Sequence, residues 1–512
     1  MIMRPLLIAG WFAVQCSTAS YAQEQSSGEL ALAGKALGAA TLTSIQVTGR
    51  GSDYVVGQSY DASSPWPRFA MPSFTMAIDF AQPAIRLERT RAQGEQPPRG
   101  GALQPLAGEL RLVQLLAGDA VWNETNGRPT FAGTGGAVRG ESPGIGLHTP
   151  TQYEERLLQI WLTPQGFIKA AARNHARLRT AVVGEARKTF VTFETPTRLT
   201  LEGVLNESHL VERIETRIAH PVLGDTLIEA VFLGYRDFAG VTFPTRIVHR
   251  EAGYPVFDLT VTGVKANVPA RIDVPAALPQ PPPAAPVEPQ KMADGVWLFR
   301  GGNQSMAVEL RDYVVVLDAP TDEAQSIAEI DSIKQLVPGK PINYVVNTHL
   351  HFDHAGGLRT YAAEGATIVT QRDNIGYYEQ IWAGPRTINP DRLAKTGKQP
   401  IFEGVLGSRT LTDGARTLVI YHYPGNAHNS GMLMVFLPQE RILFEADSFL
   451  PTGRPGAAHP AIPNLLQFYD ALQRLGLDVE RIVPTHGQVS TFADLQKTVD
   501  EAKTAVNAGA GR

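Results

Sequence analysis

Cysteine is nearly absent from this sequence. Cys16 is the only one among 512 residues, and it lies in an N-terminal segment that we expect to be removed. A mature chain without cysteine can form no disulfide and offers no thiolate as a metal ligand or nucleophile. An oxidising compartment therefore poses no difficulty for it.

The apolar run near the N-terminus, Leu6 to Val14, is too short to span a bilayer, which needs about 20 residues. Met1 to Arg4 give it a positive start, and small residues from Ser17 to Ala22 follow it, as in a secretory signal. We therefore expect a signal peptide over residues 1–22, a periplasmic or secreted protein, and no stable membrane insertion after cleavage. A retained N-terminal anchor is the alternative.

The chain also lacks an excess of positively charged residues. The formal net charge is −4 and no long basic run occurs, which argues against a nucleic-acid partner because phosphate binding needs a basic surface. Hydrophobic residues make up 43% and charged residues 19%, the balance of a soluble globular protein, and the length suggests two or three domains. We expect a small-molecule substrate, while the oligomeric state stays open.

What the sequence does have is a proline-rich segment over residues 275–290. Repeated proline fixes φ and removes backbone donors, so this segment is not expected to form a helix or a central strand. It should be an extended linker. It separates an N-terminal domain over 23–274 from a C-terminal domain over 291–512.

The N-terminal domain ends in successive strand-like segments with glycine, proline, asparagine and aspartate between them. They are 189–193, 198–201, 210–218, 226–235, 245–250 and 255–264. Short turns favour an antiparallel sheet, and a helix is expected before it over 166–179. The stretch from Tyr235 to Pro244 resembles the half-barrel sheets of exported lipoprotein-carrier-like domains. We therefore expect an antiparallel β-rich, half-barrel-like domain with helices.

The histidines of this domain lack the spacing of metal ligands and are expected to be surface or core residues. They are His148, His175, His209, His220 and His249.

The C-terminal domain alternates strands with helices, which predicts an α/β fold. Expected strands are 295–299, 306–310, 312–318, 342–347, 366–370, 418–421, 432–436, 441–444 and 481–484. Expected helices are 321–337, capped by Thr321, then 356–363 and 465–475. Residues 383–401 are expected to be a long loop near the site that affects substrate choice.

The most informative segment runs from Asn347 to Gly357 and places three histidines and an aspartate within six positions. His349 and His351 point the same way if the chain is extended, whereas the two remaining side chains project toward a second ion. Imidazole nitrogen and carboxylate oxygen both suit zinc. The candidate ligands of this segment and of later strand ends are His349, His351, Asp353, His354, His428, Asp447 and His486.

In order and spacing these residues resemble the motifs of the metallo-β-lactamase superfamily, over roughly residues 295–490. Asp318 resembles the first motif, and His349 to His354 resemble the second. The third, fourth and fifth motifs are resembled by Gly425 to His428, by Ala446-Asp447 and by His486-Gly487, in that order. The resemblance implies an αββα sandwich, with two Zn²⁺ ions, or iron or manganese, at one edge of two facing sheets.

The same resemblance implies a division of the ligands. One ion would be held by His349, His351 and His428, and the other by Asp353, His354 and His486. Asp447 would bridge the ions, as in the glyoxalase II and lactonase branches. The alternative is an aspartate that does not bridge, because the Glu-Ala-Asp-Ser at 445–448 is similar to some β-lactamases. Asp318 and Ser448 are expected outside the ligand set, with Asp318 orienting a ligand histidine.

Two ions that share a water would lower its pKa to about 7 and give hydroxide at neutral pH. We therefore expect an exported dinuclear hydrolase that attacks an ester, lactone, thioester or amide, with Asp353 as the catalytic carboxylate. A β-lactamase, an iron-dependent oxidoreductase similar to sulfur dioxygenases, and a binding protein are the alternatives. Side chains that would either line the pocket or pack in the structure are His422, His459, Tyr377, Tyr378 and Trp382.

Overall fold

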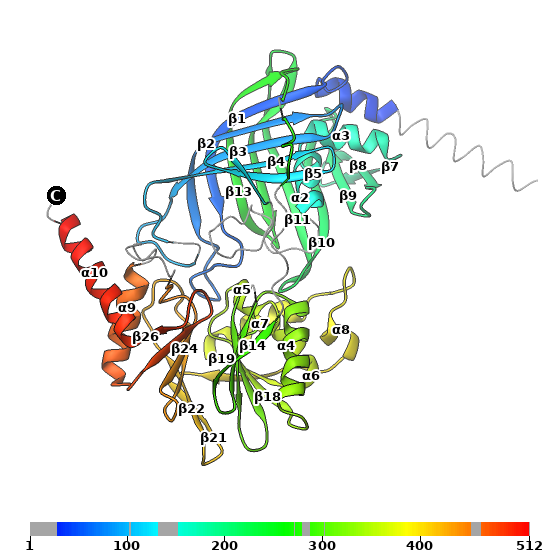
Figure 1. The fold of residues 1–512 in the computed structure, drawn as a ribbon. Helices are drawn as coiled ribbons and strands as arrows, with labels where there is room; N and C mark the ends of the chain where they lie inside the picture. The colour runs from blue at the N-terminus through cyan, green and yellow to red at the C-terminus, as the bar shows by residue number, and fades with distance from the viewer. Residues whose placement is uncertain are drawn as a thin grey trace, which may run out of the picture.

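The computed structural model shows two domains, one above the other in Figure 1. It describes residues 28–101, 104–131, 152–270, 272–278, 287–301, 303–451 and 462–510. The predicted signal peptide, Cys16, His148 and His459 lie outside these residues. Among the described residues, none of the helices combines the length and the apolar character that a membrane span requires.

The N-terminal domain is built on one antiparallel sheet of 13 strands, in the order β6-β5-β4-β3-β2-β1-β13-β12-β11-β10-β9-β8-β7. Strands that are consecutive in sequence pair with each other, except β6 and β7, which lie at the two edges of the sheet. The first strand, β1, also pairs with the last, β13. The first six are β1 (Ser44–Tyr54), β2 (Arg68–Asp79), β3 (Ala84–Gln93), β4 (Glu109–Ala117), β5 (Ala120–Thr125) and β6 (Arg128–Phe131). The others are β7 (Arg177–Val183), β8 (Ala186–Glu194), β9 (Thr200–Leu205), β10 (Val211–His220), β11 (Gly224–Phe238), β12 (Val241–Glu251) and β13 (Tyr254–Ala266).

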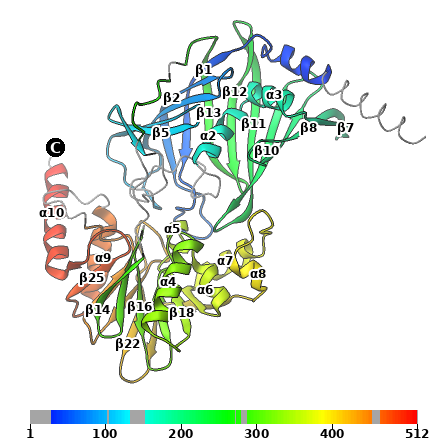
Figure 2. The same cartoon turned by 45° about the vertical axis from the view of Figure 1, so that its right-hand side comes forward.

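The sheet curls around two helices, α2 (Gln152–Trp161) and α3 (Pro164–Arg173), as Figures 1 and 2 show. These helices pack on each other, while α2 contacts β4 and β5 and α3 contacts β8. Because those strands stand near opposite edges of the sheet, short helices can reach both only if the sheet is strongly curved. A third helix, over residues 28–36, joins the same apolar core. The predicted antiparallel β-rich domain with helices is confirmed.

The helix predicted over 166–179 is wrong in its second half. It begins at Pro164, where the Thr163 side chain accepts a hydrogen bond from Gly166 N, and it ends at Arg173. His175 then has a positive φ of 50°, which no helix continues through. Residues 177–183 pair with β8 as an edge strand instead.

No strand is predicted before residue 131, and on β3 one physical reason is visible, because the buried face of this strand is not wholly apolar. On β3, Arg89 and Arg91 occupy buried positions that alternate with more exposed ones. Both guanidinium groups pair with the buried carboxylate of Asp53 on β1, at 2.9 and 2.8 Å. A buried charge of this kind requires such a partner, and the alternation of the strand is therefore invisible to a hydrophobicity pattern.

The C-terminal domain contains two facing sheets. The seven-stranded sheet holds β14 (Glu288–Ala293), β15 (Val296–Arg300), β16 (Ser305–Glu309), β17 (Val314–Leu317), β18 (Ile342–Val346), β19 (Thr367–Gln371) and β20 (Ile401–Val405). The six-stranded sheet holds β21 (Ser408–Thr412), β22 (Thr417–His422), β23 (Leu433–Leu437), β24 (Ile442–Glu445), β25 (Arg481–Pro484) and β26 (Ser490–Thr491).

Helices cover the outer face of each sheet. Those beside the seven-stranded sheet are α4 (Glu323–Leu336), α5 (Phe352–Ala355), α6 (Leu358–Glu364), the 3₁₀ turn η1 (Arg372–Asn374), α7 (Ile375–Trp382) and α8 (Arg392–Thr396). Those beside the six-stranded sheet are α9 (Ile462–Leu475) and α10 (Phe492–Ala510). The N-cap of α4 is Asp322, whose side chain accepts from Gln325 N, and not the predicted Thr321.

Three apolar layers hold this domain together. Val316 and Val345 pack outward against Ile330 of α4, while Val315 and Val346 face the other sheet and pack near Val435. A third cluster joins the six-stranded sheet to α9 and α10. Consecutive buried residues thus serve opposite faces of one strand, as expected for a sheet covered on both sides. The predicted αββα sandwich is confirmed.

The first strand of this sandwich, β14, begins at Glu288, inside the segment predicted as a linker. It lies at the edge of its sheet and has no neighbouring strand on one side. Proline, which has no N–H to donate, is tolerated in such an edge strand, as at Pro289. Of the linker, residues 279–286 lie outside the described residues.

Candidate metal centre

The H-x-H-x-D-H segment leaves the end of β18 and enters the short helix α5. His351 is still extended, with φ −62° and ψ 146°, whereas Asp353 and His354 lie in the first helical turn. This change of backbone conformation sends the two pairs of side chains in different directions, as the spacing predicted. Tyr378 supports the loop from behind: its hydroxyl donates to Asn347 Oδ1, and Asn347 Nδ2 donates to the His349 carbonyl.

The other three candidate ligands follow strands of the second sheet. His428 lies between β22 and β23, Asp447 follows β24, and His486 follows β25. All of them therefore reach the same edge of the sandwich as the first segment. The structure brings together all seven side chains that were proposed as ligands, in two groups.

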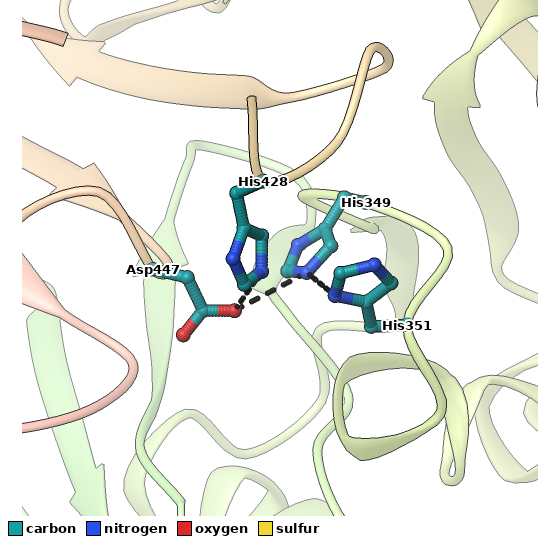
Figure 3. Close-up of side chains that lie close together, drawn as sticks. All are labelled: His349, His351, His428 and Asp447. Atoms are coloured by element: carbon teal, nitrogen blue, oxygen red, sulfur yellow. Dashed lines mark hydrogen bonds and ion pairs between the residues drawn. The ribbon is translucent and has the colours of Figure 1, made fainter. Parts of the chain in front are cut away.

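The first group contains His349, His351, His428 and Asp447, whose side chains point toward one another in Figure 3. His349 Nε2 lies 2.9 Å from His351 Nδ1 and 3.2 Å from Asp447 Oδ2. His428 Nε2 lies 3.0 Å from the same carboxylate oxygen.

The second group contains Asp353, His354, His486 and again Asp447. Asp353 Oδ2 lies 3.5 Å from His354 Nε2 and 3.3 Å from His486 Nε2. Asp447 Oδ2 is 2.9 Å from His354 Nε2, and Asp447 Oδ1 is 3.1 Å from His486 Nε2. Asp447 therefore stands between the groups and contributes to both.

These donors fit metal ions. In each group one ligand atom per residue lies within 4.8 Å of the others, and the ligand types are imidazole nitrogen and carboxylate oxygen. His428 Nε2 is buried and lies 3.0 Å from Asp447 Oδ2, yet the two atoms are not aligned for a hydrogen bond, although buried polar atoms normally make one. A cation between the nitrogens and the carboxylate would satisfy it.

The charges in the site favour the same interpretation. Burial lowers the pKa of His349 to about 4 and that of His351 well below its ordinary value, so both imidazoles are neutral and offer a lone pair. Burial opposes a charge on His354, but Asp447, Asp353 and Asp318 raise its pKa well above the ordinary range. The pKa values of Asp353 and Asp447 are correspondingly lowered, against burial, by the neighbouring histidines. The second group is thus rich in negative charge, as a cation site should be.

Asp318 and Ser448 lie beside the ligands and not among them. Asp318 Oδ2 accepts from His354 Nδ1 at 2.7 Å and from Thr485 Oγ1 at 3.0 Å. Ser448 Oγ lies 2.9 Å from the Tyr423 hydroxyl and accepts from Asn426 Nδ2, and so ties the loop after β24 to the loop that carries His428.

Sequence reasoning missed two residues of the N-terminal domain that reach this centre. Gln58 Nε2 donates to Asp353 Oδ1 at 2.8 Å, and His351 Nε2 lies 2.8 Å from the Ser59 carbonyl oxygen. No local signal could have found them, because Gln58 and Asp353 stand 295 positions apart.

The remaining candidates do not join either group. His422 Nδ1 lies 3.1 Å from the Leu406 carbonyl oxygen, and Nε2 lies 2.9 Å from the Ser430 carbonyl oxygen. Trp382 and Tyr378 are buried in the core beside α7, and Tyr377 packs at its margin. Among the described residues, the N-terminal histidines are also absent from both groups.

The segment predicted as a long loop over 383–401 contains α8 and contacts the N-terminal domain. Asp225 N donates to the Pro385 carbonyl, and the Asp225 carboxylate accepts from Thr387. The Arg386 guanidinium donates to the carbonyl of Pro221 at 3.0 Å. This segment therefore joins the two domains.

Comparison with known proteins identifies relatives of the C-terminal domain. Residues 298–486 match the model of the metallo-beta-lactamase superfamily. The 2,4-dinitroanisole O-demethylase subunit alpha of Nocardioides sp. (strain JS1661) is 26% identical over 198 residues, which cover 37% of this chain. The matched part is 55% of that relative, so this chain spans about half of its length.

An acyl-coenzyme A thioesterase of Gallus gallus is 27% identical over 222 residues, covering 37% of this chain and 71% of the relative. Among solved structures, a metallo-beta-lactamase from Pontibacter korlensis is 21% identical, with a TM-score of 0.32. That match covers 42% of this chain and 98% of the other.

Proposed function

Because residues 298–486 form a domain of the metallo-beta-lactamase superfamily, we propose that this protein is an exported hydrolase that uses two metal ions. Membership supports a metal-dependent hydrolase as the general class. The observation that carries the dinuclear proposal is the position of Asp447, which belongs to both ligand groups. A single-ion oxidoreductase would need only one group, and the second group of His354, His486 and Asp353 argues against it.

The ligands divide between the ions as their groups do. One ion would be held by His349, His351 and His428, the other by Asp353, His354 and His486, with Asp447 between them. Zn²⁺ suits this set, and iron or manganese would also fit. When bound, the ions would lower the pKa of a shared water to about 7 and polarise the carbonyl of the substrate.

Asp353 is the residue we assign to proton transfer. Its Oδ2 faces His354 and His486, whereas Oδ1 accepts a hydrogen bond from the Gln58 amide. A carboxylate oxygen has two acceptor positions, so Oδ1 can also orient a water and hold its proton before the leaving group takes it. The lowered pKa of Asp353 keeps its carboxylate anionic at neutral pH, as a metal ligand and hydrogen-bond acceptor requires.

The substrate class follows from this chemistry as a carbonyl compound with a leaving group: an ester, lactone, thioester or amide. We would test an acyl thioester first, because one relative is named an acyl-coenzyme A thioesterase. A β-lactam is the second candidate, favoured by Ala446-Asp447-Ser448.

A panel of these substrates, assayed with zinc-loaded and chelator-treated protein, tests the proposal. We expect zinc-dependent hydrolysis of at least one class, with nitrocefin reporting β-lactams. Hydrolysis that survives complete removal of metal would overturn it.

Export is part of the same proposal and rests on the residues before Gln23. It predicts that protein recovered from the periplasmic fraction of the producing cell begins at Gln23. Recovery from the cytoplasm with Met1 retained would contradict it.

A further inference from the structure

The segment that follows β1, residues 55–60, crosses from the N-terminal domain onto the loops that carry the metal ligands. Its backbone accepts from Phe352 N at Gly57 O and from Ser430 N at Tyr60 O, at 3.2 and 2.8 Å. It thus holds both the H-x-H-x-D-H segment and the loop of His428. Two of its residues go further and touch ligand side chains.

Ser59 fixes the ring of His351. A carbonyl oxygen can only accept, so the His351 Nε2 that lies 2.8 Å from Ser59 O must carry the ring proton. With the proton on Nε2, Nδ1 is the ring nitrogen left to bind a metal ion, and it is the nitrogen that faces His349. Asn429 Nδ2 donates to the same carbonyl at 3.0 Å and holds it in place.

Gln58 fixes the carboxylate of Asp353. Its amide nitrogen donates to Oδ1 at 2.8 Å, on the side of the carboxylate away from the two histidines. With Oδ1 held, Oδ2 stays directed at His354 and His486. Such outer hydrogen bonds orient ligands and raise metal affinity.

The contact between the domains is close enough to need glycine. Gly57 has a φ of +75°, and a Cβ there would lie 2.3 Å from the Phe352 ring. Phe352, whose neighbours in sequence are the ligands His351 and Asp353, packs with Trp66 and Val222 in an apolar cluster of the N-terminal domain. The metal-binding segment is therefore anchored from both domains.

From these contacts we infer that the N-terminal domain is part of the metal centre. Gln58 is a positioning residue for the ion that Asp353 binds, and the Ser59 carbonyl is the corresponding group for the ion that His351 binds. The inference rests on the proposed two-metal function and adds to it a role for a domain that the family match does not cover.

The test uses the full-length protein, freed of metal and titrated with Zn²⁺ against a chromophoric chelator to give two stepwise affinities. Gln58→Met keeps the length of the side chain but removes its donor, and Gln58→Ala removes both. Gln46→Ala is the matched control, since Gln46 is a half-buried glutamine on β1, the strand that leads into the segment. A His486→Ala background, which removes a ligand of the second group, shows which ion is affected.

We expect both Gln58 variants to lower the affinity for one of the two zinc ions by about 10-fold to 100-fold. The affinity for the other ion and the melting temperature should stay close to those of the wild type. In the His486→Ala background the Gln58 change should have no further effect. If Gln58 had a purely structural role, its loss would lower the affinity for both ions and the melting temperature together. If the wild type binds two ions and Gln58→Met binds both equally well, the inference is overturned. Failure of the wild type to bind zinc would instead overturn the proposed function.

Discussion

His354 donates from Nδ1 to Asp318 Oδ2 across 2.7 Å, and neither side chain is exposed. The other carboxylate oxygen of Asp318 accepts from the backbone and the hydroxyl of Thr348, so the group cannot turn away. This bond leaves His354 Nε2 as the nitrogen that faces Asp353 and Asp447. A residue that binds no metal in our assignment thereby fixes one that does.

Asp318→Asn tests that relationship. An amide keeps the shape but must turn its NH₂ toward either His354 or Thr348, each of which is a donor. We expect zinc affinity to fall by about 10-fold to 100-fold, as for other partners of ligand histidines. Chelator competition measures it, with Asp312→Asn as the control because Asp312 is exposed at the start of the same strand region. Wild-type affinity in Asp318→Asn would remove Asp318 from the scheme.

Loss of a ligand should abolish both binding and hydrolysis. His351→Ala removes a fully buried nitrogen donor of the first group, and we expect it to lose at least one ion and the hydrolytic activity. His422→Ala is the matched control, because the ring nitrogens of His422 face two backbone carbonyls and His422 belongs to neither ligand group. Full activity in metal-free His351→Ala would disprove metal-dependent hydrolysis.

A buried acid predicts a pH dependence of stability. Burial raises the pKa of Glu329 from 4.5 to about 7, although Gln325 and Tyr361 donate hydrogen bonds to it. Between these pH values the folded protein holds a proton that the unfolded chain has lost. Stability should therefore fall as pH rises through this window, by up to about 3 kcal/mol.

Glu329→Gln removes this titration. Denaturant unfolding of the metal-free protein at pH 5 and pH 8 should show a smaller loss of stability in the variant than in the wild type. Equal losses in the two proteins would mean that Glu329 is not the group responsible.

Substitution of Trp382 tests whether this side chain is a core residue or a substrate contact. It packs against Phe402 and Tyr378 at 5.1 and 5.8 Å between ring centroids and is 9% exposed. Trp382→Ala should therefore lower the free energy of unfolding by about 3–5 kcal/mol and leave KM near that of the wild type. A large rise in KM with unchanged stability would place it in the substrate pocket.

How far the sequence predicts this structure depends on the distance over which each feature is encoded. The strand Val314–Leu317 is apolar on both faces, and the ligands in the loop after β18 lie within six positions of one another, so the local sequence predicts both features. The end of α3 cannot be predicted locally in this way, because the residue type of His175 gives no clear signal of its positive φ.

The N-terminal domain shows the opposite case. Arg89 and Arg91 stand on a buried face only because Asp53 meets them from another strand. Gln58 meets Asp353 only because the two domains pack together. Contacts of this kind belong to the tertiary structure, and no pattern within one segment specifies them.

Metal content and hydrolysis, measured together on the purified full-length protein, decide whether this is a dinuclear hydrolase. Mass spectrometry should find two zinc ions per chain, and the same preparation should cleave at least one of the thioester, lactone, ester, amide or β-lactam substrates. A protein that contains a single iron ion and hydrolyses none of them would contradict the proposal, and would assign the same ligands to oxidative chemistry.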